Sequence, residues 1–315
     1  MVRLEVRIPI SPKPHYFQRV RLIAHSILSL GPIYRDTIFR VFVGGDQQPE
    51  NLNERLPWSA SCGIEWCWVN RADFLRWRGT AHPYIATMME RFRPPFYGRH
   101  VLMLDADVVA VRPFDELIAI AEARPSVLGV MAHATPFRPF HSQYWNTLFQ
   151  RFGCPAPEFS FEHSGWGIMD NDPRSRQGPP YFNTGVLLVP SEILCRLYKP
   201  YMAAIETVRS VFDNYFVEQI GLTLAVCKES IPYHILPLRY NYPNDPGFDD
   251  AWSLELANVC LLHFLRDAVV RRDTDFTSLE SMASLIERGD LRGSNEVLRS
   301  RVADLLPAMM ADSGR

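Results

Sequence analysis

The sequence predicts an α/β protein built on a largely parallel sheet. Segments with the two-residue period of a strand alternate with segments of helical spacing through the first half of the chain. In 2–10 apolar residues alternate with mostly charged ones, as in a strand, and 16–28 have the spacing of a helix that ends at Gly31-Pro32. Helices that connect strands in this way return the chain to the same end of the sheet, so neighbouring strands are expected to be parallel.

The later segments continue this alternation. Strands are expected at 38–43, 64–69, 101–111 and 126–131, and helices near 80–92 and after Pro113. In the second half the expected elements are a strand at 181–190, helices near 191–211 and 214–227, and an apolar run at 259–264. Because ligands of such sheets bind beyond the carboxyl ends of the strands, polar residues at those ends are the first candidates for a site.

Length and composition are those of an ordinary globular chain. Its 315 residues can bury a sizeable core; 47% are hydrophobic and 22% are charged. The formal charge of −2 gives no electrostatic reason to expect a nucleic acid partner. We expect no signal peptide and no membrane span, since no apolar stretch approaches the ~18 residues that a span requires. Six cysteines without a C-x-x-C pair predict buried free thiols, a reducing compartment and a cytoplasmic protein.

Two aspartates interrupt the most apolar predicted strand. Asp105 and Asp107 lie within 101–111, and residues two apart on a strand point to the same side. Two unpaired carboxylates in an apolar sheet would be costly, and a bound divalent cation removes that cost because such cations take carboxylate oxygens. The alternative is a strand end whose acids cap the next turn. The pattern alone leaves both interpretations open.

Other polar positions lie in apolar surroundings. Asn183 introduces an apolar strand and can both donate to and accept from a ligand, while Gly185 permits close approach. Glu218 and Gln219 lie among apolar neighbours and are expected to point into a site. His263 is a single imidazole in an apolar run. Such a histidine is more often a satisfied core residue, but a carboxylate pair that needs further ligands favours a ligand role.

Residues 132–181 are expected to form a long irregular loop, because they combine many prolines and glycines with aromatic residues. Side chains such as Trp145 and Trp166 could stack on a sugar or another flat ligand. The alternative is a hydrophobic cluster packed under the loop.

The C-terminal segment 295–310 has the pattern of an amphipathic helix, with Arg299 and Arg301 on its polar side. Docking onto the domain is the simpler interpretation. A weak peripheral contact with a membrane surface is the alternative, because the helix is basic and amphipathic.

Short motifs occur in a defined order along the chain. They are Leu104-Asp105-Ala106-Asp107, Phe182-Asn183-Thr184-Gly185-Val186, Glu218-Gln219, Leu236-Pro237 with Tyr240-Asn241, and His263-Phe264. This order resembles the family 8 glycosyltransferases of the GT-A fold, the group of glycogenin and of bacterial lipopolysaccharide galactosyl- and glucosyltransferases. The resemblance implies a GT-A (Rossmann-like) catalytic domain over 1–270, with 132–181 on its acceptor side, and a C-terminal helical extension over 271–315.

The resemblance implies transfer of a sugar from a nucleotide diphosphate sugar, taken here as a uridine diphosphate (UDP) sugar, to a carbohydrate or other hydroxyl acceptor. The anomeric configuration would be retained. In the family the two D-x-D carboxylates and the late histidine bind Mn²⁺, with Mg²⁺ as the alternative, and the ion bridges the diphosphate. Here these ligands would be Asp105, Asp107 and His263. Two carboxylates with one imidazole suit Mn²⁺ better than Ca²⁺.

The same resemblance assigns roles around the donor. Asn183 and Gln219 would hold the donor sugar, with Glu218 beside them where the family has an aspartate. Ser11 would lie near the base and ribose, and Arg78 is a candidate contact to a phosphate or sugar.

The late motif departs from the family pattern, which continues as H-F-x-G-x-x-K-P-W. This chain continues with Leu265-Arg266-Asp267 and lacks the lysine that contacts phosphate. We expect Arg266, Arg271 or Arg272 to replace it, since guanidinium groups pair well with phosphates. The departure indicates a distant branch of the family.

Two other functions remain open on the sequence. A nucleotide-sugar-binding protein without transferase activity would carry the same motifs. A strand that ends in D-x-D-x-V also occurs in haloacid dehalogenase phosphatases, where Asp105 would be the nucleophile. In those enzymes the motif follows the first strand, whereas Asp105 lies far along this chain.

Overall fold

A seven-stranded sheet forms the centre of the computed structural model, which describes residues 4–77, 84–137, 141–162 and 177–312. Its strands are, in spatial order, β10 (Tyr233–Ile235), β6 (Val127–Met131), β9 (Phe182–Pro190), β4 (His100–Leu104), β1 (Leu4–Ile10), β2 (Ile38–Val43) and β3 (Ile64–Trp68). Within this sheet β9 runs antiparallel to both neighbours, and the other adjacent pairs are parallel. The predicted α/β fold with a mixed, mostly parallel sheet is confirmed.

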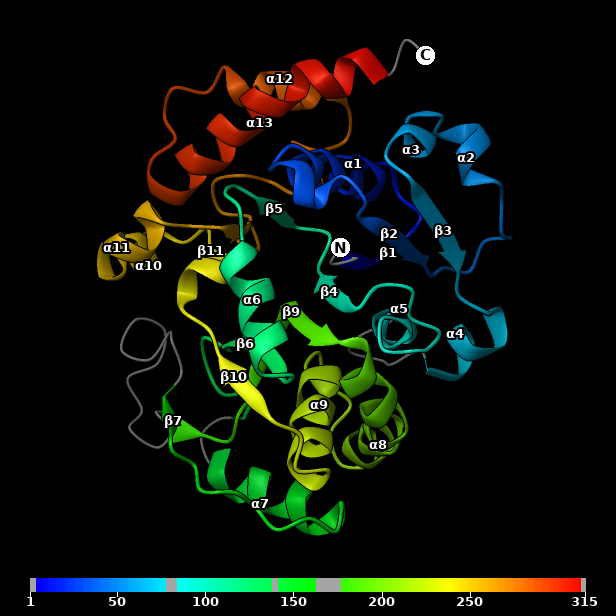
Figure 1. Ribbon diagram of the computed structural model, residues 1–315, viewed down its shortest axis with the longest axis vertical. Helices are drawn as coiled ribbons and strands as arrows, with labels where there is room; N and C mark the ends of the chain where they lie inside the picture. Colours follow the sequence, from blue (N-terminus) through cyan, green and yellow to red (C-terminus); the bar gives the residue numbers. More distant parts are fainter. Residues whose placement is uncertain (1–3, 78–83, 138–140, 163–176, 313–315) are drawn as a thin grey trace.

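Helices cover both faces of the sheet (Figure 1). Alternate residues of β4 show the division, because Leu102 and Leu104 pack in one core and Val101 and Met103 in the other. The first core includes α1 (Pro14–Leu28), α6 (Asp115–Ala123), α12 (Leu279–Ile286) and α13 (Gly293–Ala311). The second includes α5 (Ile85–Glu90), α7 (His141–Arg151), α8 (Ser191–Arg209) and α9 (Val217–Lys228). Burial on both faces explains why β4 and β6 are almost continuously apolar.

Shorter elements complete the fold. The short helices are α2 (Leu52–Arg55), α3 (Trp58–Ser61), α4 (Arg71–Trp77), α10 (Pro246–Ala251) and α11 (Ser253–Ala257). A second sheet contains β11 (Tyr242–Pro243), β12 (Leu261–His263) and β5 (Val108–Ala110), and β7 (Phe161–Glu162) pairs with β8 (Gln177–Gly178). In the described part of the chain, 3₁₀ turns occur at Pro32–Tyr34 and Leu238–Tyr240.

The segment 101–111 is not the single strand that we predict. After β4 the chain turns through Asp105–Asp107, and β5 then joins the second sheet. The Asp105 N–H donates to the Gly185 carbonyl (2.9 Å), which extends the β4–β9 pairing into the turn. β5 pairs with β12 and places His263 opposite Val108. The two aspartates therefore lie where the chain crosses from one sheet to the other, and not on one face of a strand.

Residues 132–181 are not irregular throughout, contrary to our prediction, because α7 lies within them. Trp145 on this helix is fully buried, and its ring lies 5.2 Å from Phe137 and 5.5 Å from Tyr181, between centroids. Trp145 is therefore a core residue and is not available to stack on a ligand. Trp166 lies outside the described residues, as does Arg78.

The C-terminal helix docks onto the domain, as in the simpler of our two interpretations. Leu298 and Val302 of α13 are buried in the same core as α1. Arg301, which we predict on the polar side, donates to the carbonyls of Ala110 and Ser26 and so faces the domain. The apolar face of α13 is thereby covered, which leaves the membrane alternative without support.

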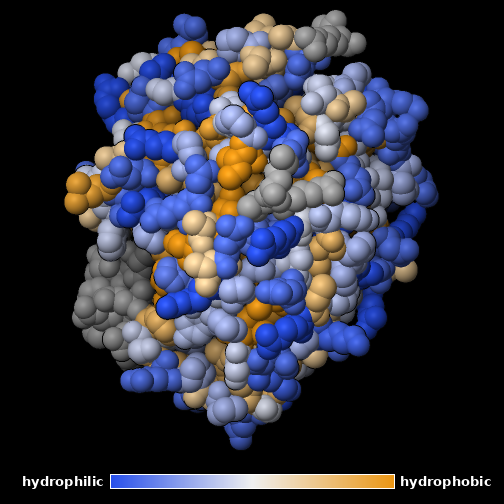
Figure 2. Space-filling model, viewed as in Figure 1, coloured by the Kyte–Doolittle hydropathy of each residue, from blue (hydrophilic) through white to orange (hydrophobic). Residues whose placement is uncertain are grey.

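The surface of the protein is largely polar on the face that Figure 2 shows. On the face shown in Figure 2, hydrophilic residues are interspersed over most of the surface. Among the described helices, none combines the length and apolar character needed to cross a membrane.

Candidate active site

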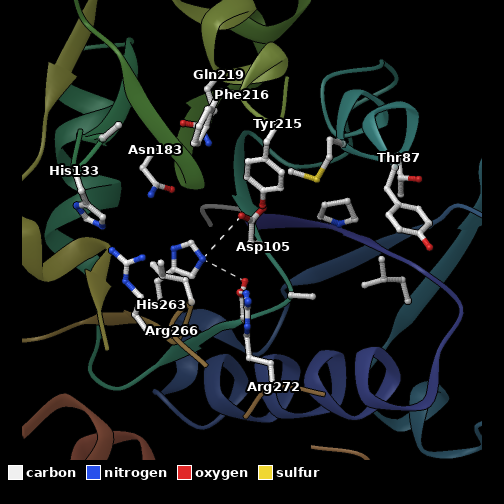
Figure 3. Close-up of a pocket in the computed structure, with 18 of the residues that line it drawn as sticks. Thr87, Asp105, His133, Asn183, Tyr215, Phe216, Gln219, His263, Arg266 and Arg272 are labelled. Atoms are coloured by element: carbon white, nitrogen blue, oxygen red, sulfur yellow. Dashed lines mark hydrogen bonds and ion pairs between the residues drawn. The ribbon is translucent and has the colours of Figure 1, made fainter. Parts of the chain in front are cut away.

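A cavity of about 970 Å³ opens at the edge of the sheet where β1 and β4 end. Because β9 is antiparallel, its first residues lie at this same edge. Ser11 lines the cavity after β1. Figure 3 shows the other lining residues of interest: Asp105 after β4, Asn183 from the start of β9, Gln219 from α9 and His263 from β12. Five residues that we singled out in the sequence therefore converge in one cavity, although they belong to five separate segments.

Asp105, Asp107 and His263 form a cluster of the kind that binds a metal ion. One carboxylate oxygen of each aspartate and one imidazole nitrogen all lie within 4.8 Å of one another. His263 Nε2 lies 3.2 Å from Asp107 Oδ1 and 3.9 Å from Asp105 Oδ2 (Figure 3). Asp107 and His263 are buried, and Asp105 is partly exposed toward the cavity. Such a set of carboxylate oxygens and one imidazole suits a divalent transition metal.

Neighbouring polar groups fix the orientation of the His263 ring. Its Nδ1 lies 2.9 Å from Asn241 Oδ1. The Asn241 side-chain amide donates in turn to the Asn183 carbonyl (3.5 Å). This bond fixes the Asn241 side chain so that its Oδ1 faces the imidazole. A neutral ring held in this way carries its proton on Nδ1 and directs the Nε2 lone pair toward the aspartates. This contact gives a physical role to the asparagine of the Tyr240-Asn241 motif.

Arg91 is a buried cation that the sequence analysis did not identify. It is fully buried, and its Nη1 donates to Asp105 Oδ1 (3.0 Å) and to the Thr184 carbonyl (3.1 Å). Its Nη2 donates to both carboxylate oxygens of Glu218 (3.5 Å each). Arg91 therefore connects Asp105 of the candidate metal cluster to a second carboxylate in the core. The only sequence signal is its position in an arginine-rich segment shortly before β4.

From its apolar neighbours we predict that Glu218 points into the site. In the structure it points into the core instead. It is 2% exposed and accepts a hydrogen bond from the Thr184 hydroxyl in addition to its pair with Arg91. Burial raises the pKa of Glu218, although Arg91 opposes the shift. On α9 successive residues point about 100° apart, so the adjacent Gln219 faces the cavity while Glu218 faces the core.

Arg272 lies next to the cluster of Asp105, Asp107 and His263. Its Nη1 lies 2.5 Å from Asp107 Oδ2, and its Nη2 lies 2.6 Å from Asp267 Oδ2. Burial acts to raise the pKa of Asp107, but the charge and hydrogen bond of His263 and the charge of Arg272 hold it well below its ordinary value. Asp107 is therefore ionised, as a metal ligand must be.

The structure separates the three arginines that we expect as replacements for the family lysine. Arg266 and Arg272 line the cavity, and Arg266 also pairs with Asp245 (3.1 Å). Arg271 is exposed outside the lining, and its backbone N–H donates to Asp275 (2.8 Å). The expectation for Arg271 is therefore not supported, because the turn that directs its neighbour inward directs Arg271 to the surface.

Arg19 on α1 is a second cation that the sequence analysis missed. It is 3% exposed and lines the cavity together with Tyr16, whose ring centroid lies 4.2 Å from the guanidinium carbon. Its charge contributes to the lowered pKa of Asp107. The available signal was the spacing of Tyr16 and Arg19, which share one face of the helix that follows Ser11.

Two exposed aromatic side chains form part of the cavity wall. Tyr215 is 57% exposed and Phe216 is 37% exposed, and their rings meet edge to face at 5.3 Å between centroids. They precede α9, one turn before Gln219, and lie on its side of the cavity (Figure 3). The sequence analysis did not single them out. We expect aromatic side chains for ligand stacking only from 132–181. Tyr215 and Phe216, just before α9, also offer them.

Solved structures of glycosyltransferases share this fold. The galactosyltransferase LgtC, in complex with donor and acceptor sugar analogues, has a TM-score of 0.54 and 15% identity, over 96% of this chain and 95% of that chain. Mouse xyloside xylosyltransferase 1, apo form, has a TM-score of 0.52 and 15% identity, over 86% of this chain and 100% of that chain. The bifunctional glycosyltransferase WbbM, apo structure, has a TM-score of 0.53 and 14% identity, over 100% of this chain and 52% of that chain. The chain therefore has the GT-A fold, at a large sequence distance from these proteins.

A family model narrows the class. Residues 79–229 match the Rhodobacterales glycosyltransferase domain, and this span contains Asp105, Asp107, Asn183 and Gln219. Together with the fold, this match identifies a glycosyltransferase enzyme, as the resemblance implies. It also favours a glycosyltransferase over the phosphatase alternative. No curated protein matches the sequence.

Proposed function

We propose that the enzyme transfers a sugar from a UDP-sugar to a hydroxyl acceptor, with a divalent cation in the cavity and with retention of the anomeric configuration. The observation that carries this proposal is the cluster of Asp105, Asp107 and His263 inside a large cavity at the carboxyl ends of the strands. The UDP base, the metal and the stereochemistry rest on the resemblance stated above. The size of the cavity and its polar lining support the binding of a sugar nucleotide, and the Asp-Asp-His cluster supports the binding of a cation.

The cluster fits Mn²⁺, or Mg²⁺ as the alternative. Its three ligand atoms are close enough to share one ion, and the Asn241 contact already orients the imidazole as a ligand. A bound cation would stabilise the negative charge that develops on the diphosphate as the glycosidic bond breaks. Of the two ions, Mn²⁺ is better suited to a set that includes an imidazole nitrogen.

The remaining polar residues would bind the donor along the cavity. Asn183 and Gln219 would hold the sugar, and Ser11 would lie near the base and ribose. Arg19 and Arg272 line the cavity on the side of Asp107 and would pair with the phosphates. On binding, the diphosphate would compete with Asp107 for the Arg272 guanidinium and so release one carboxylate oxygen toward the cation.

We place the acceptor on the side of Tyr215 and Phe216. Their exposed rings offer flat apolar faces next to Gln219, and the segment 133–136 lines the same cavity. We therefore keep 132–181 as an acceptor-side region, within a catalytic domain over 1–270. The C-terminal extension over 271–315 contributes Arg272 to the site. The six cysteines are free thiols in the structure, which supports our proposal of a cytoplasmic location.

A donor panel tests the proposal. Thermal shift with uridine, guanosine and cytidine diphosphates, each with and without Mn²⁺, should give the largest rise in Tm for uridine diphosphate with Mn²⁺. Release of the nucleoside diphosphate from the corresponding sugars should follow the same order. A larger shift with a guanosine or cytidine nucleotide would overturn the UDP assignment. Absence of binding and turnover with every donor would overturn the proposed reaction.

A further inference from the structure

A second cluster of metal-ligating side chains lies away from the cavity, where α1, α3 and α13 meet. His25 comes from the last turn of α1, Cys62 follows α3 and Asp312 follows α13 (Figure 1). One ligand atom of each lies within 4.8 Å of the other two. Among the described residues, only this cluster and the one in the cavity have this property.

The contact between His25 and Asp312 has the distance of a hydrogen bond but not its angle. His25 Nε2 lies 3.1 Å from Asp312 Oδ2, yet it has no partner with hydrogen-bond geometry among the described residues. A nitrogen and an oxygen that point at each other would form that bond at this distance. Two atoms that both point at a third position lie close together without forming it, and this is the arrangement of two ligands around one ion.

The surroundings are those of a built site. Cys62 is 5% exposed, and the side chains of His25 and Asp312 are 12% and 19% exposed. The Ser61 hydroxyl donates to Asp312 Oδ2 (3.1 Å) and so orients the carboxylate from outside the cluster. Arg21 donates to the Met309 carbonyl, and its charge acts on both His25 and Cys62. A thiolate and a carboxylate together balance the charge of a divalent ion.

We propose that His25, Cys62 and Asp312 bind one Zn²⁺, with water in the fourth position. Sulfur, imidazole nitrogen and carboxylate oxygen are the ligands that zinc takes in proteins, and thiolate favours it over the oxygen-preferring cations. The ion would join three segments that are far apart in the sequence and would anchor the end of α13 to α1. Because α1 lines the cavity through Tyr16 and Arg19, the site would stabilise one wall of the active site from behind.

Cobalt tests this site separately from the cavity cluster. The full-length protein, reduced and stripped of metal, is titrated with Co²⁺, and the near-ultraviolet absorption of a thiolate-to-cobalt charge transfer is recorded. The cavity cluster has no sulfur ligand, so it cannot produce this band. We expect the band to saturate at one equivalent, to persist in Asp107→Ala and to disappear in Cys62→Ser. The matched control is Cys154→Ser, another buried thiol, which should retain the band.

Two measurements keep the test decisive if Cys62→Ser fails to fold. Asp312→Asn, at the edge of the cluster, should weaken Co²⁺ binding at least tenfold, since even outer partners of a metal site contribute about 10–100-fold. In the unmodified protein, Zn²⁺ should slow alkylation of Cys62 and raise Tm. Absence of the band in the wild-type chain, or its persistence in Cys62→Ser, would overturn the proposal. So would alkylation of Cys62 at the same rate with and without Zn²⁺.

Discussion

Gly185 leaves the space that the ring of His263 occupies. A Cβ atom at position 185 would lie 2.3 Å from His263 Cε1 and 2.8 Å from Nδ1, well inside van der Waals contact. The same glycine accepts the Asp105 N–H through its carbonyl and donates its own N–H to Asn183 Oδ1 (2.9 Å). One residue without a side chain therefore sets the positions of a metal-ligand candidate, the D-x-D turn and a donor-sugar candidate.

Gly185→Ala should displace the imidazole and weaken Mn²⁺ binding more than it weakens the fold. The ring must rotate or move, and either change turns Nε2 away from the aspartates. Mn²⁺ affinity can be measured by the loss of the free-ion electron paramagnetic resonance signal, with Tm measured in parallel. Gly289→Ala is the matched control, because nothing lies within 4 Å of its added Cβ. Unchanged Mn²⁺ affinity in Gly185→Ala would show that His263 is not a ligand.

Asp107→Ala should abolish cation-dependent release of the nucleoside diphosphate from a UDP-sugar while the protein stays folded. The variant removes a carboxylate that the proposed cation needs. The fold should persist because Arg272 keeps its pair with Asp267 and His263 keeps its contact with Asn241. Circular dichroism would verify the fold, and a coupled assay would measure the release. Full activity of the wild-type enzyme in excess EDTA would contradict the metal assignment.

Arg272→Ala should weaken binding of uridine diphosphate about ten- to a hundredfold. A hydrogen bond to a charged group contributes roughly 1.5–3 kcal/mol, and each 1.4 kcal/mol corresponds to about a factor of ten in Kd. Titration calorimetry in the presence of Mn²⁺ gives the Kd. Arg271→Ala is the neighbouring control, because that side chain lies outside the cavity lining and should leave the Kd unchanged. Equal effects of both variants would mean that bulk charge, and not a specific contact, attracts the diphosphate.

Arg91→Met should destabilise the fold by about 3–5 kcal/mol, because it leaves Asp105 and the buried Glu218 without their cation. Adding Glu218→Gln should recover part of this loss, since the buried charge is then removed as well. The free energies of unfolding come from urea denaturation of the two single variants and the double variant. An additive double variant would show that Arg91 and Glu218 are not coupled.

The stability of the Arg91→Met variant should depend on pH, because the variant removes the cation that pairs with Glu218. Burial raises the pKa of Glu218 above its value in the unfolded chain, and removal of Arg91 takes away the largest effect that opposes this shift. The unfolded chain then releases this proton at lower pH than the folded chain. Stability should therefore fall as pH rises through the folded pKa of Glu218 and recover as pH is lowered. Glu218→Gln in the same background should remove this dependence.

Tyr215→Ala and Trp145→Ala should have opposite effects. Trp145 is fully buried in the core, so its loss should cost about 3–5 kcal/mol of stability. Tyr215 is mostly exposed on the cavity wall, so its loss should leave Tm unchanged and lower transfer to the acceptor. Hydrolysis of the donor should be unchanged or raised, because water still reaches the sugar. Normal transfer by Tyr215→Ala would place the acceptor elsewhere.

The sequence by itself determined the features that depend on local order. Apolar runs and the 3.6-residue spacing are visible in the chain because each strand or helix buries its own side chains. The strands predicted at 38–43 and 126–131 and the predicted C-terminal helix therefore lie close to β2, β6 and α13. Asp105, Asp107, Asn183 and His263 stood out because polar groups in apolar strands require partners. These four residues indeed meet in one cavity.

Only the tertiary structure decided which partners those groups have. The D-x-D residues lie in a turn between two sheets because β5 leaves β4 to pair with β12, a choice of strand partner that no local period records. Arg91 reaches Asp105 and Glu218 because β4, β9 and α9 pack together, so three residues far apart in sequence share one charge network. The side on which a residue such as Arg271 or Arg272 emerges depends on the rotation of a single turn. Non-local pairing and local rotation therefore complete the site that local pattern can only indicate.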